Sequence, residues 1–453
     1  MTDRLFGTDG IRGRVNTNAI RPHMFVRFGE ALGSVLKSQS SRPQVLIGRD
    51  TRQSGHMIEA AIEAGLFNAG ASTIRGGVLP TPAVGCLVPQ IGADAGLMIT
   101  ASHNPPEDNG VKVFGADGFK LSAEQQTELE ALIQNMSADL FADVGLMGAP
   151  ENRYELSQIY VDFAKKTFSS SGSLSGLRIC LDAANGAASG VAESVFAELG
   201  AEIVSSIASS PDGRNINAGC GAMHPEKLQD SVSQTNADIG IAFDGDADRI
   251  VIVNEKAEIV DGDQIMGAIG LEYARRGALR GNTVVSTIMS NMGLEFALAE
   301  QGISLERTKV GDRYVVERMR EGGFVVGGEQ SGHIILTDYV TTGDAIISAL
   351  KILGIMTTEN RAASEVLSVF EPVPQILKNI RYSSSDPLAD TSVVAELTSV
   401  TENLGKTGRI VVRKSGTEPV IRVMAEAVEH DDAENAVDRL IGAISDADER
   451  AGK

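Results

Sequence analysis

The stretch AGLMITASHNPP, residues 95–106, joins an apolar segment to a polar loop and carries the clearest fold signal in the chain. Residues 95–99 are apolar without a break, which predicts a short buried β-strand. Thr100–Pro105 follows directly, and a second proline, Pro106, helps to fix the way the chain leaves the loop. The hydroxyl of Ser102 is therefore held at the end of a strand, where open α/β sheets bind their ligands.

Short apolar segments alternate with helical patterns on both sides of this strand. We predict strands at residues 45–48, 177–181, 238–243, 283–287 and 324–326, and helices at residues 56–68, 190–199 and 312–321. This alternation predicts mixed or parallel sheets covered by helices. Beyond Glu371–Pro374 the pattern changes to strands at residues 408–413 and 420–428 and a helix at residues 432–445, which indicates a small α+β domain.

The composition limits the class of protein and the kind of partner. A chain of 453 residues, 42% of them hydrophobic, is long enough for about three or four domains with their own cores. The net charge of −20 and the absence of tryptophan argue against nucleic acid or an anionic membrane as a partner. If the substrate is an anion, its positive contacts must be gathered locally.

Nothing in the sequence predicts export or a membrane anchor. The chain has no run of about 18 apolar residues, and its start lacks the apolar core of a signal peptide. Cys86, Cys180 and Cys220 lie far apart, without metal-ligand spacing. We therefore predict reduced, buried thiols and a cytoplasmic location.

The second strong signal is DGDADR, residues 244–249, which follows a predicted strand. Asp244, Asp246 and Asp248 alternate with small residues, so an extended or turning loop directs the three carboxylates to one side. Converging carboxylates repel one another unless a cation lies among them, and Mg²⁺ prefers oxygen ligands. An EF-hand is disfavoured because its sixth position requires glycine and here is Arg249. The non-functional alternative is a solvated acidic turn.

Two chemistries fit Ser102, a hydrolase nucleophile and a phosphoryl carrier. The Gly-x-Ser-x-Gly turn of α/β-hydrolases is absent. His103 is adjacent, and neighbouring side chains on an extended chain diverge, which makes His103 a poor general base. A phosphoserine would bring nearly two negative charges and complete a Mg²⁺ site with the three aspartates. We therefore favour the phosphoryl carrier.

Weaker motifs offer groups that a phosphorylated sugar would need. RKSGTEP, residues 413–419, is a basic turn between predicted strands that suits a phosphate, although an isolated turn is more often a plain hairpin. GGEQSGH, residues 327–333, carries polar groups that suit sugar hydroxyls or a proton shuttle. GTDGIRG, residues 7–13, offers Arg12, and Lys112 is either a functional cation or a surface lysine.

Four motifs together resemble, in order along the chain, the signatures of the α-D-phosphohexomutases. They are residues 100–105, 244–249, 328–333 and 413–419. The resemblance covers essentially the whole chain, and the first two motifs are highly specific. Residues 7–13 and 415–419 look like the bacterial branch of the family that acts on glucosamine phosphates.

The resemblance implies a heart-shaped α/β enzyme with four domains around a central cleft. Three mixed α/β domains, covered by helices, each give one loop to the cleft, and a smaller α+β domain closes it. The implied domains are residues 1–150 with the phosphoserine loop, 151–253 with the metal-binding loop, 254–368 with the sugar-binding loop and 369–453 with the phosphate-binding turn. Composition alone favours a first boundary at the serine-rich stretch 169–173 instead.

The implied reaction interconverts glucosamine 6-phosphate and glucosamine 1-phosphate, on the route to UDP-N-acetylglucosamine and peptidoglycan. Ser102 would carry the phosphoryl group, and glucosamine 1,6-bisphosphate would be the intermediate. The implied Mg²⁺ ligands are Ser102, Asp244, Asp246 and Asp248. The implied catalytic groups are Ser102, Arg12, Lys112 and His333. The implied substrate-binding residues are His103, Arg249, Glu329, Ser331, Arg413, Ser415, Gly416, Thr417 and Arg422.

Three alternative functions stay open at this point. The nearest is the same chemistry on mannose or glucose phosphate, a phosphomannomutase or phosphoglucomutase. A phosphoserine phosphatase-like hydrolase would release phosphate, and a Ca²⁺-binding module would have no turnover. By family likeness we also expect a homodimer, and a kinase or autophosphorylation must first load Ser102.

Overall fold

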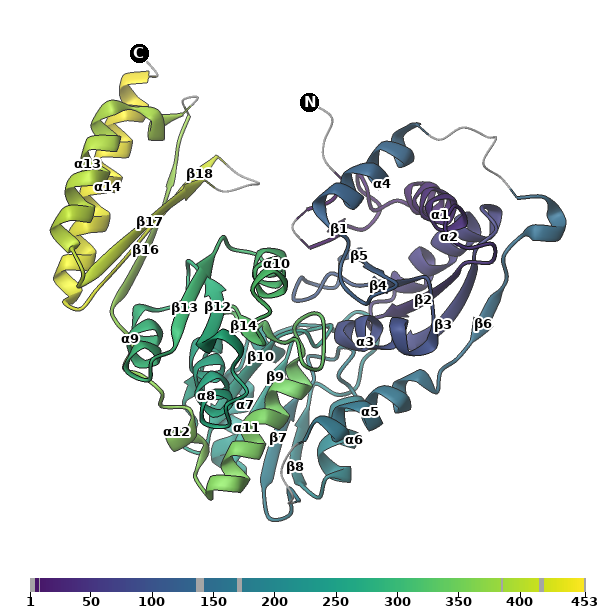
Figure 1. Ribbon diagram of the computed structural model, residues 1–453, viewed down its shortest axis with the longest axis horizontal. Coiled ribbons are helices and arrows are strands. Elements are labelled where there is room, and N and C mark those ends of the chain that lie inside the picture. The colour runs from purple at the N-terminus through teal and green to yellow at the C-terminus, as the bar shows by residue number, and fades with distance from the viewer. Residues whose placement is uncertain are drawn as a thin grey trace. The chain divides into compact units, whose positions relative to one another are not determined.

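The structure is a computed structural model and describes residues 5–7, 9–135, 142–168, 173–383, 386–414 and 419–451. The chain divides into two compact units, one of residues 1–287 and 306–368 and the other of residues 288–305 and 369–453. Figure 1 labels most of the helices and strands of both units.

The six-stranded first sheet carries the Ser102 loop, and its strand order is β1-β5-β4-β2-β3-β6. The strands are β1 (Ile11–Arg14), β2 (Gln44–Arg49), β3 (Ser72–Val78), β4 (Ala95–Ile99), β5 (Asp108–Gly115) and β6 (Pro150–Asn152), and the helices are α1 (Pro22–Lys37), α2 (Gly55–Asn68), α3 (Thr81–Ile91) and α4 (Ala123–Asn135). β4 is parallel to β2, antiparallel to β5 and buried over its whole length. A central strand covered on both faces needs apolar side chains on both, which explains why residues 95–99 show no alternation.

The second sheet carries the aspartate loop, and its strand order is β11-β10-β9-β7-β8. The strands are β7 (Arg178–Asp182), β8 (Glu202–Ile207), β9 (Ile239–Phe243), β10 (Ile250–Asn254) and β11 (Ile259–Val260), and the helices are α5 (Leu156–Thr167), α6 (Val191–Glu198) and α7 (Glu226–Thr235). β9 and β10 pair antiparallel with Phe243 opposite Ile250, so residues 244–249 form a hairpin loop. This pairing excludes an EF-hand, in which a helix leaves the loop.

The third sheet has the order β13-β12-β14-β15. Its strands are β12 (Thr283–Thr287), β13 (Ser304–Thr308), β14 (Val326–Gly328) and β15 (Ile334–Leu336), and the associated helices are α8 (Gly262–Arg275), α10 (Asp312–Gly322), α11 (Ala345–Glu359) and α12 (Ala363–Val366). The prediction of a strand at residues 324–326 was wrong by two residues, because pairing starts at Val326, opposite Val284. Phe324 is apolar because it packs in a core with Met319 of α10, and not because it pairs in the sheet.

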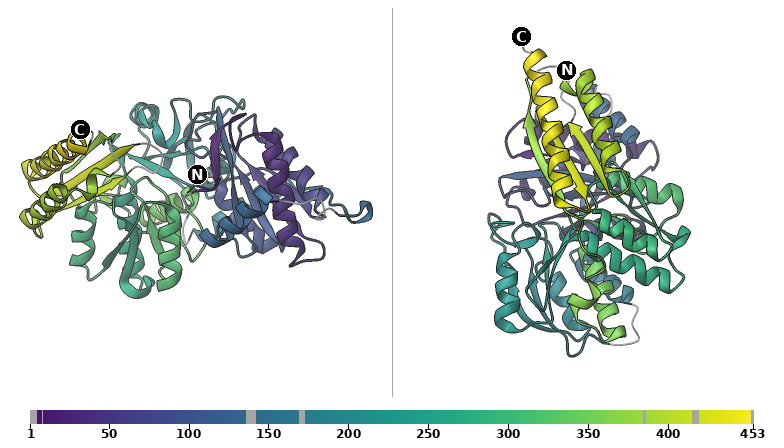
Figure 2. Two further views of the ribbon diagram at one scale, coloured as in Figure 1. Left: turned by 90° about the horizontal axis from the view of Figure 1, so that it is seen from above. Right: turned by 90° about the vertical axis from the view of Figure 1, so that its left-hand side faces the viewer.

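The smaller unit contains a three-stranded antiparallel sheet with β18 at its centre. Its elements are α9 (Met292–Glu300), β16 (Gln375–Arg381), α13 (Thr391–Leu404), β17 (Gly408–Lys414), β18 (Val420–Ala427) and α14 (His430–Ala451). Figures 1 and 2 show α13 and α14 side by side. α14 extends beyond the predicted end at residue 445, because Ala447 continues the buried face formed by Leu440 and Ile444.

The predicted fold class, three mixed α/β sheets covered by helices and a smaller α+β part, is confirmed. β6 pairs with β3, so the first sheet extends to Asn152, past the predicted boundary at residue 150. The four domain limits stay a prediction.

The three cysteines are buried thiols, as predicted. Burial raises the pKa of Cys86 to about 12 and that of Cys220 to about 11, so both stay protonated near neutral pH. Among the helices that the structure describes, none combines the length and apolar character needed to cross a membrane.

Candidate active site

Ser102 lies just after β4 and is almost completely buried. Its Oγ donates a hydrogen bond of 2.7 Å to Asp244 Oδ2, and its backbone N–H donates to Thr100 Oγ1 at 2.8 Å. Its φ is +51°, in the left-handed region, which costs a residue other than glycine about 1 kcal/mol. The loop around Ser102 must therefore be held in place by its neighbours.

The left-handed backbone also corrects the prediction for His103. Side chains of neighbouring residues diverge on an extended chain, but the chain at Ser102 is not extended. His103 Nδ1 consequently lies 3.3 Å from Ser102 Oγ. Burial, with Arg249 and Arg12 nearby, lowers the pKa of His103 to about 4. The imidazole is therefore neutral at pH 7 and able to accept a proton.

We expect His103 in the unphosphorylated protein to titrate near pH 4, well below the ~6.5 of a free histidine. His103 takes up its proton at a higher pH in the unfolded chain than in the folded chain. The contribution of neutral His103 to the free energy of unfolding is therefore complete above about pH 6.5 and is lost as the pH falls toward 4. NMR of the ring nitrogens measures the titration. His103→Gln should reduce the loss of thermal stability over this range, whereas the control His430→Gln, at an exposed site, should not. Titration of His103 near 6.5 would contradict the prediction.

Arg52 holds the Ser102 loop from the neighbouring strand. Its fully buried guanidinium donates to the carbonyl oxygens of Ser102 at 2.9 Å, Asn104 at 2.7 Å and Asp108 at 3.0 Å, and also to that of Pro105. Its Nε donates to Asp50 Oδ2 at 2.9 Å, and Asp50 in turn accepts from Thr100 Oγ1. Five donors in a fixed plane match such a set of acceptors, which a lysine could not.

The second sheet supports the same loop. Asn217 Nδ2 donates to the carbonyl oxygens of Ser102 at 2.8 Å and Asn104 at 2.9 Å. Neither Asn217 nor Arg52 was predicted from the sequence. The available signal for Arg52 was its position in the loop that follows the predicted strand 45–48, at the sheet edge that also carries Ser102.

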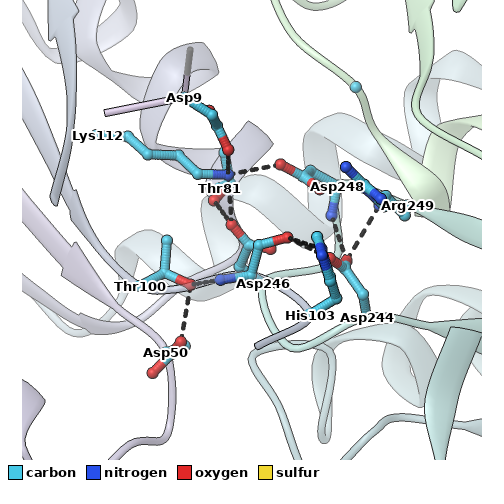
Figure 3. Close-up of polar contacts among 12 residues, drawn as sticks. Asp9, Asp50, Thr81, Thr100, His103, Lys112, Asp244, Asp246, Asp248 and Arg249 are labelled. Atoms are coloured by element: carbon cyan, nitrogen blue, oxygen red, sulfur yellow. Dashed lines mark hydrogen bonds and ion pairs between the residues drawn. The ribbon is translucent and has the colours of Figure 1, made fainter. Parts of the chain in front are cut away.

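The three aspartates form one buried cluster, whose ligand atoms lie within 4.8 Å of one another. Lys112 Nζ donates to Asp246 Oδ2 at 2.8 Å and to Asp248 Oδ2 at 2.7 Å (Figure 3). The other oxygen of each, Oδ1, is buried. That of Asp246 has no hydrogen-bond partner among the described residues, and that of Asp248 has only the ring Nδ1 of His333, at 3.5 Å. Buried carboxylate oxygens without a partner are costly unless a cation binds them. The cluster therefore fits a hard cation such as Mg²⁺, oriented by Lys112.

The charges in this cluster depend on one another. Burial, Asp248 and Asp246 together raise the pKa of Asp244 well above its usual value. Burial also acts to raise that of Asp248, but Lys112 and His333 outweigh it and hold this pKa well below the usual value. Burial opposes the charge of Lys112, yet Asp246 and Asp248 keep its pKa well above normal. Lys112 is thus a charged ammonium group and not a base in this arrangement.

We expect Asp246→Asn to weaken Mg²⁺ binding by more than the roughly 10- to 100-fold cost of losing an outer-shell partner. The substitution removes one charge from the cluster. It also replaces one oxygen of Asp246, either the unpartnered Oδ1 or the Oδ2 that accepts from Lys112. Calorimetric titration of chelator-treated protein with Mg²⁺ measures the loss. Asp230→Asn, on the exposed face of α7, is the control and should bind as the unaltered chain does. Equal affinities would contradict a metal site at the cluster.

Four further predicted residues belong to the larger unit: Arg12, Arg249, Glu329 and Ser331. Arg12, on β1, pairs with Asp9 at 2.6 Å. Arg249 is mostly buried, and its Nε has no hydrogen-bond partner among the residues described. Glu329 accepts from the backbone N–H of Gly311 at 3.1 Å, and Ser331 is exposed. The Nε of Arg249 and the exposed hydroxyl of Ser331 are thus able to bind a polar ligand.

His333 lies against the metal cluster. Its Nε2 accepts a hydrogen bond of 3.0 Å from the backbone N–H of Gly343, and its Nδ1 lies 3.5 Å from Asp248 Oδ1. Both ring nitrogens are therefore engaged by the protein, which favours a positioning role over proton exchange with substrate.

Two charged residues that the sequence analysis missed extend the network. Lys120 Nζ bridges Asp9 Oδ1 at 2.6 Å and Asp312 Oδ2 at 2.5 Å, and Asp9 Oδ2 lies 3.2 Å from Lys112 Nζ. Asp9 belongs to the motif at residues 7–13, but no local pattern marked Lys120 or Asp312.

In the smaller unit, Arg413 and Arg422 lie directly opposite each other on β17 and β18. Burial, together with Arg422, lowers the pKa of Arg413. Arg422 Nε is buried without a hydrogen-bond partner in the described part of the chain. Like charges across a strand pair are unfavourable, so an anion would stabilise them. Ser415, Gly416 and Thr417 lie outside the described residues.

A buried serine hydroxyl bonded to one of three clustered carboxylates, on successive α/β sheets, suits metal-assisted phosphoryl transfer. Models of the phosphoglucomutase/phosphomannomutase family match the chain in four parts. They are α/β/α domain I at residues 3–139, domain II at 158–258, domain III at 261–373 and the C-terminal domain at 377–443. The chain belongs to this family, the α-D-phosphohexomutases, and the predicted class of phosphomutase is confirmed.

Curated relatives match over their whole length. The phosphoglucosamine mutase of Novosphingobium aromaticivorans is 48% identical, with 99% of this chain and 100% of the relative covered, and that of Paracoccus denitrificans is also 48% identical with the same coverage. A solved phosphoglucomutase/phosphomannomutase family protein from Burkholderia thailandensis aligns with a TM-score of 0.82 at 25% identity, covering 99% of this chain and 98% of that one. The fold is also shared by an Aspergillus fumigatus N-acetylphosphoglucosamine mutase solved with GlcNAc-6P and magnesium, at a TM-score of 0.67 and 19% identity, covering 98% and 96%.

Proposed function

We propose that this chain interconverts glucosamine 6-phosphate and glucosamine 1-phosphate. The full-length phosphoglucosamine mutase relatives confirm this function, and they do not favour the alternative of mannose or glucose phosphate. The observation that carries the chemistry is the hydrogen bond from Ser102 Oγ to Asp244, inside a cluster of carboxylates that fits Mg²⁺.

The proposed cycle moves a phosphoryl group between Ser102 and the sugar. The phosphoryl group on Ser102 Oγ passes to O1 of glucosamine 6-phosphate, the O1 hydroxyl proton passes through a nearby base to the released Ser102 Oγ, and glucosamine 1,6-bisphosphate forms. After the bisphosphate turns over, its 6-phosphoryl group passes to Ser102 Oγ, the serine proton passes back through the base to O6, and glucosamine 1-phosphate leaves. Mg²⁺ bound by Asp244, Asp246 and Asp248 would neutralise charge on the transferring oxygens.

The contacts suggest a division of roles around Ser102. His103 is neutral and 3.3 Å from Ser102 Oγ, which makes it the candidate proton acceptor. Lys112 stays charged and orients Asp246 and Asp248, while Arg12 and the unpartnered Nε of Arg249 suit phosphate oxygens.

The remaining proposed contacts involve the sugar and its distant phosphate. Glu329 and Ser331 would bind sugar hydroxyls. The residues proposed for the phosphate that does not react are Arg413, Ser415, Gly416, Thr417 and Arg422. The opposed arginines of β17 and β18 support the second assignment.

Several expectations from the sequence remain part of this proposal. They are domain limits at residues 150, 253 and 368, a cytoplasmic location, a homodimer, and priming of Ser102 by a kinase or by autophosphorylation.

The test is turnover of three substrates by the purified protein. We expect glucosamine 6-phosphate to be converted with a higher kcat/KM than glucose or mannose phosphate, without net release of phosphate. A preference for either neutral sugar would overturn the substrate, and stoichiometric release of phosphate would favour a phosphatase.

A further inference from the structure

A cavity of about 460 Å³ lies in the larger unit, apart from the proposed sugar site. Helices α1 and α4 and the loop after β5 line one side, and α10 lines the other. Neither Ser102 nor any of the three aspartates belongs to its lining. The volume lies within the roughly 300–1,000 Å³ that is usual for small-molecule sites.

Arg313, in the first turn of α10, has unused hydrogen-bonding capacity in this cavity. Its Nε and Nη1 are buried and have no hydrogen-bond partner among the residues described. Its other contacts are an ion pair of 3.8 Å between Nε and Glu317, a hydrogen bond of 3.4 Å from Nη2 to the Tyr314 hydroxyl, and a position over the Tyr314 ring. Buried charged donors that lack a hydrogen bond are costly. A carboxylate, sulfonate or phosphate would satisfy both nitrogens.

The other cations of the lining are already paired. Lys120 bridges Asp9 and Asp312, and Arg320 lies 3.6 Å from Asp117 and over the ring of Phe119. Among the three cations of this lining, Arg313 is the one with buried donors that lack a hydrogen-bond partner among the described residues.

The wall contributed by the first sheet and its helices combines apolar side chains with the acidic residues Asp94, Asp117 and Glu128. Leu36 of α1, Phe114 of β5 and Leu129 of α4 are buried side chains of this lining. A ligand that fills the cavity thus needs an apolar body as well as its acidic group.

The cavity shares a wall with the catalytic network. Lys120 and Asp312 line it, and Lys120 also bonds Asp9, which lies 3.2 Å from Lys112 Nζ. Lys112 Nζ in turn donates to the Oδ2 atoms of Asp246 and Asp248. An occupant that moved Lys120 would release Asp9 and so change the charge next to Lys112 and the two aspartates.

We propose that this cavity binds a small amphipathic anion, with an acidic group on Arg313 and an apolar ring or chain against α1 and α4. We further infer that its occupant modulates turnover through Lys120, and this second part rests on the proposed mutase function. Binding can alter turnover only if the occupant favours one arrangement of that bridge over another.

The probe is 8-anilinonaphthalene-1-sulfonate, an aromatic sulfonate of this class, followed by its fluorescence with the full chain. We expect one bound probe per chain that saturating glucosamine 6-phosphate does not displace. Arg313→Gln should weaken probe binding at least tenfold. Arg318→Gln, on the same helix but paired with Glu306 outside the cavity, should bind as the unaltered chain does.

A second variant tests whether the probe occupies the cavity itself, independently of the charge of Arg313. Val316→Phe fills the space with Arg313 intact, and it should also weaken probe binding, with circular dichroism confirming that each variant is folded. Three results would each overturn the site. They are absence of probe binding, equal affinity of the probe for both variants and the unaltered chain, and displacement of the probe by glucosamine 6-phosphate.

The coupling is measured by turnover at saturating glucosamine 6-phosphate. We expect kcat to change at least twofold as the probe saturates, with half-effect at the probe's Kd. Unchanged kcat at full occupancy would overturn the coupling. Absence of turnover without probe would contradict the mutase function instead, and the fluorescence result would stand apart from it.

Discussion

Ser102→Ala is expected to lower mutase turnover by more than about 10³-fold, or ~4 kcal/mol of activation free energy. The variant has no atom that can carry the phosphoryl group, and none of the charges around it can replace that covalent step. Turnover of glucosamine 6-phosphate and the intact mass of the protein measure the effect. The unaltered protein, once primed, should carry the extra mass of one phosphoryl group on the Ser102 peptide, and the variant should not.

Ser194→Ala is the matched control for this experiment. Ser194 lies on α6, where its Oγ donates to the carbonyl oxygen of Gly190, so its loss should change neither turnover nor the phosphorylated mass. Turnover of Ser102→Ala within tenfold of the unaltered protein, or phosphoryl mass retained by the variant, would place the carrier elsewhere.

Arg52→Met should produce the second large effect, on stability and turnover together. The substitution leaves Asp50 buried without its guanidinium and removes the Arg52 hydrogen bonds to four loop carbonyl groups, of which those of Ser102 and Asn104 keep the bond from Asn217. Breaking a buried ion pair by removing one partner costs about 3–5 kcal/mol. We also expect turnover to fall more than tenfold at temperatures where the variant is folded, because Ser102 must keep a left-handed backbone.

Thermal unfolding and kinetics of a small set of variants separate the two effects. Asp50→Asn combined with Arg52→Met removes the unpaired charge, so it should recover part of the stability but not the turnover. Arg153→Met is the control, since its ion pair with Glu155 is exposed and worth only about 0–1 kcal/mol. Full recovery of turnover in the double variant would show that Arg52 does not position the loop.

The candidate site divides clearly into what could and could not be predicted from the sequence. Ser102 and the aspartates at 244, 246 and 248 could be predicted, because each motif is contiguous and its chemistry follows from residue type and spacing. The strands before these motifs could be predicted as well, since uninterrupted apolar runs are typical of buried strands.

His103 shows why local reasoning fails where the backbone is unusual. The sequence predicted diverging side chains, but the φ of +51° at Ser102 brings His103 Nδ1 to 3.3 Å from the serine Oγ. A serine does not predict a left-handed backbone as a glycine would. At Ser102 this backbone is kept by contacts from distant parts of the chain.

The sequence by itself determined the family, the class of reaction, and the serine and acid groups that carry it, because short motifs encode these. Only the tertiary structure decided which side chains hold and connect those groups. Arg52, Lys120 and Asn217 bond partners that are 50 to 192 residues away in the chain. Such contacts depend on how the sheets place their loop ends in space, and no local pattern of residue types records that placement.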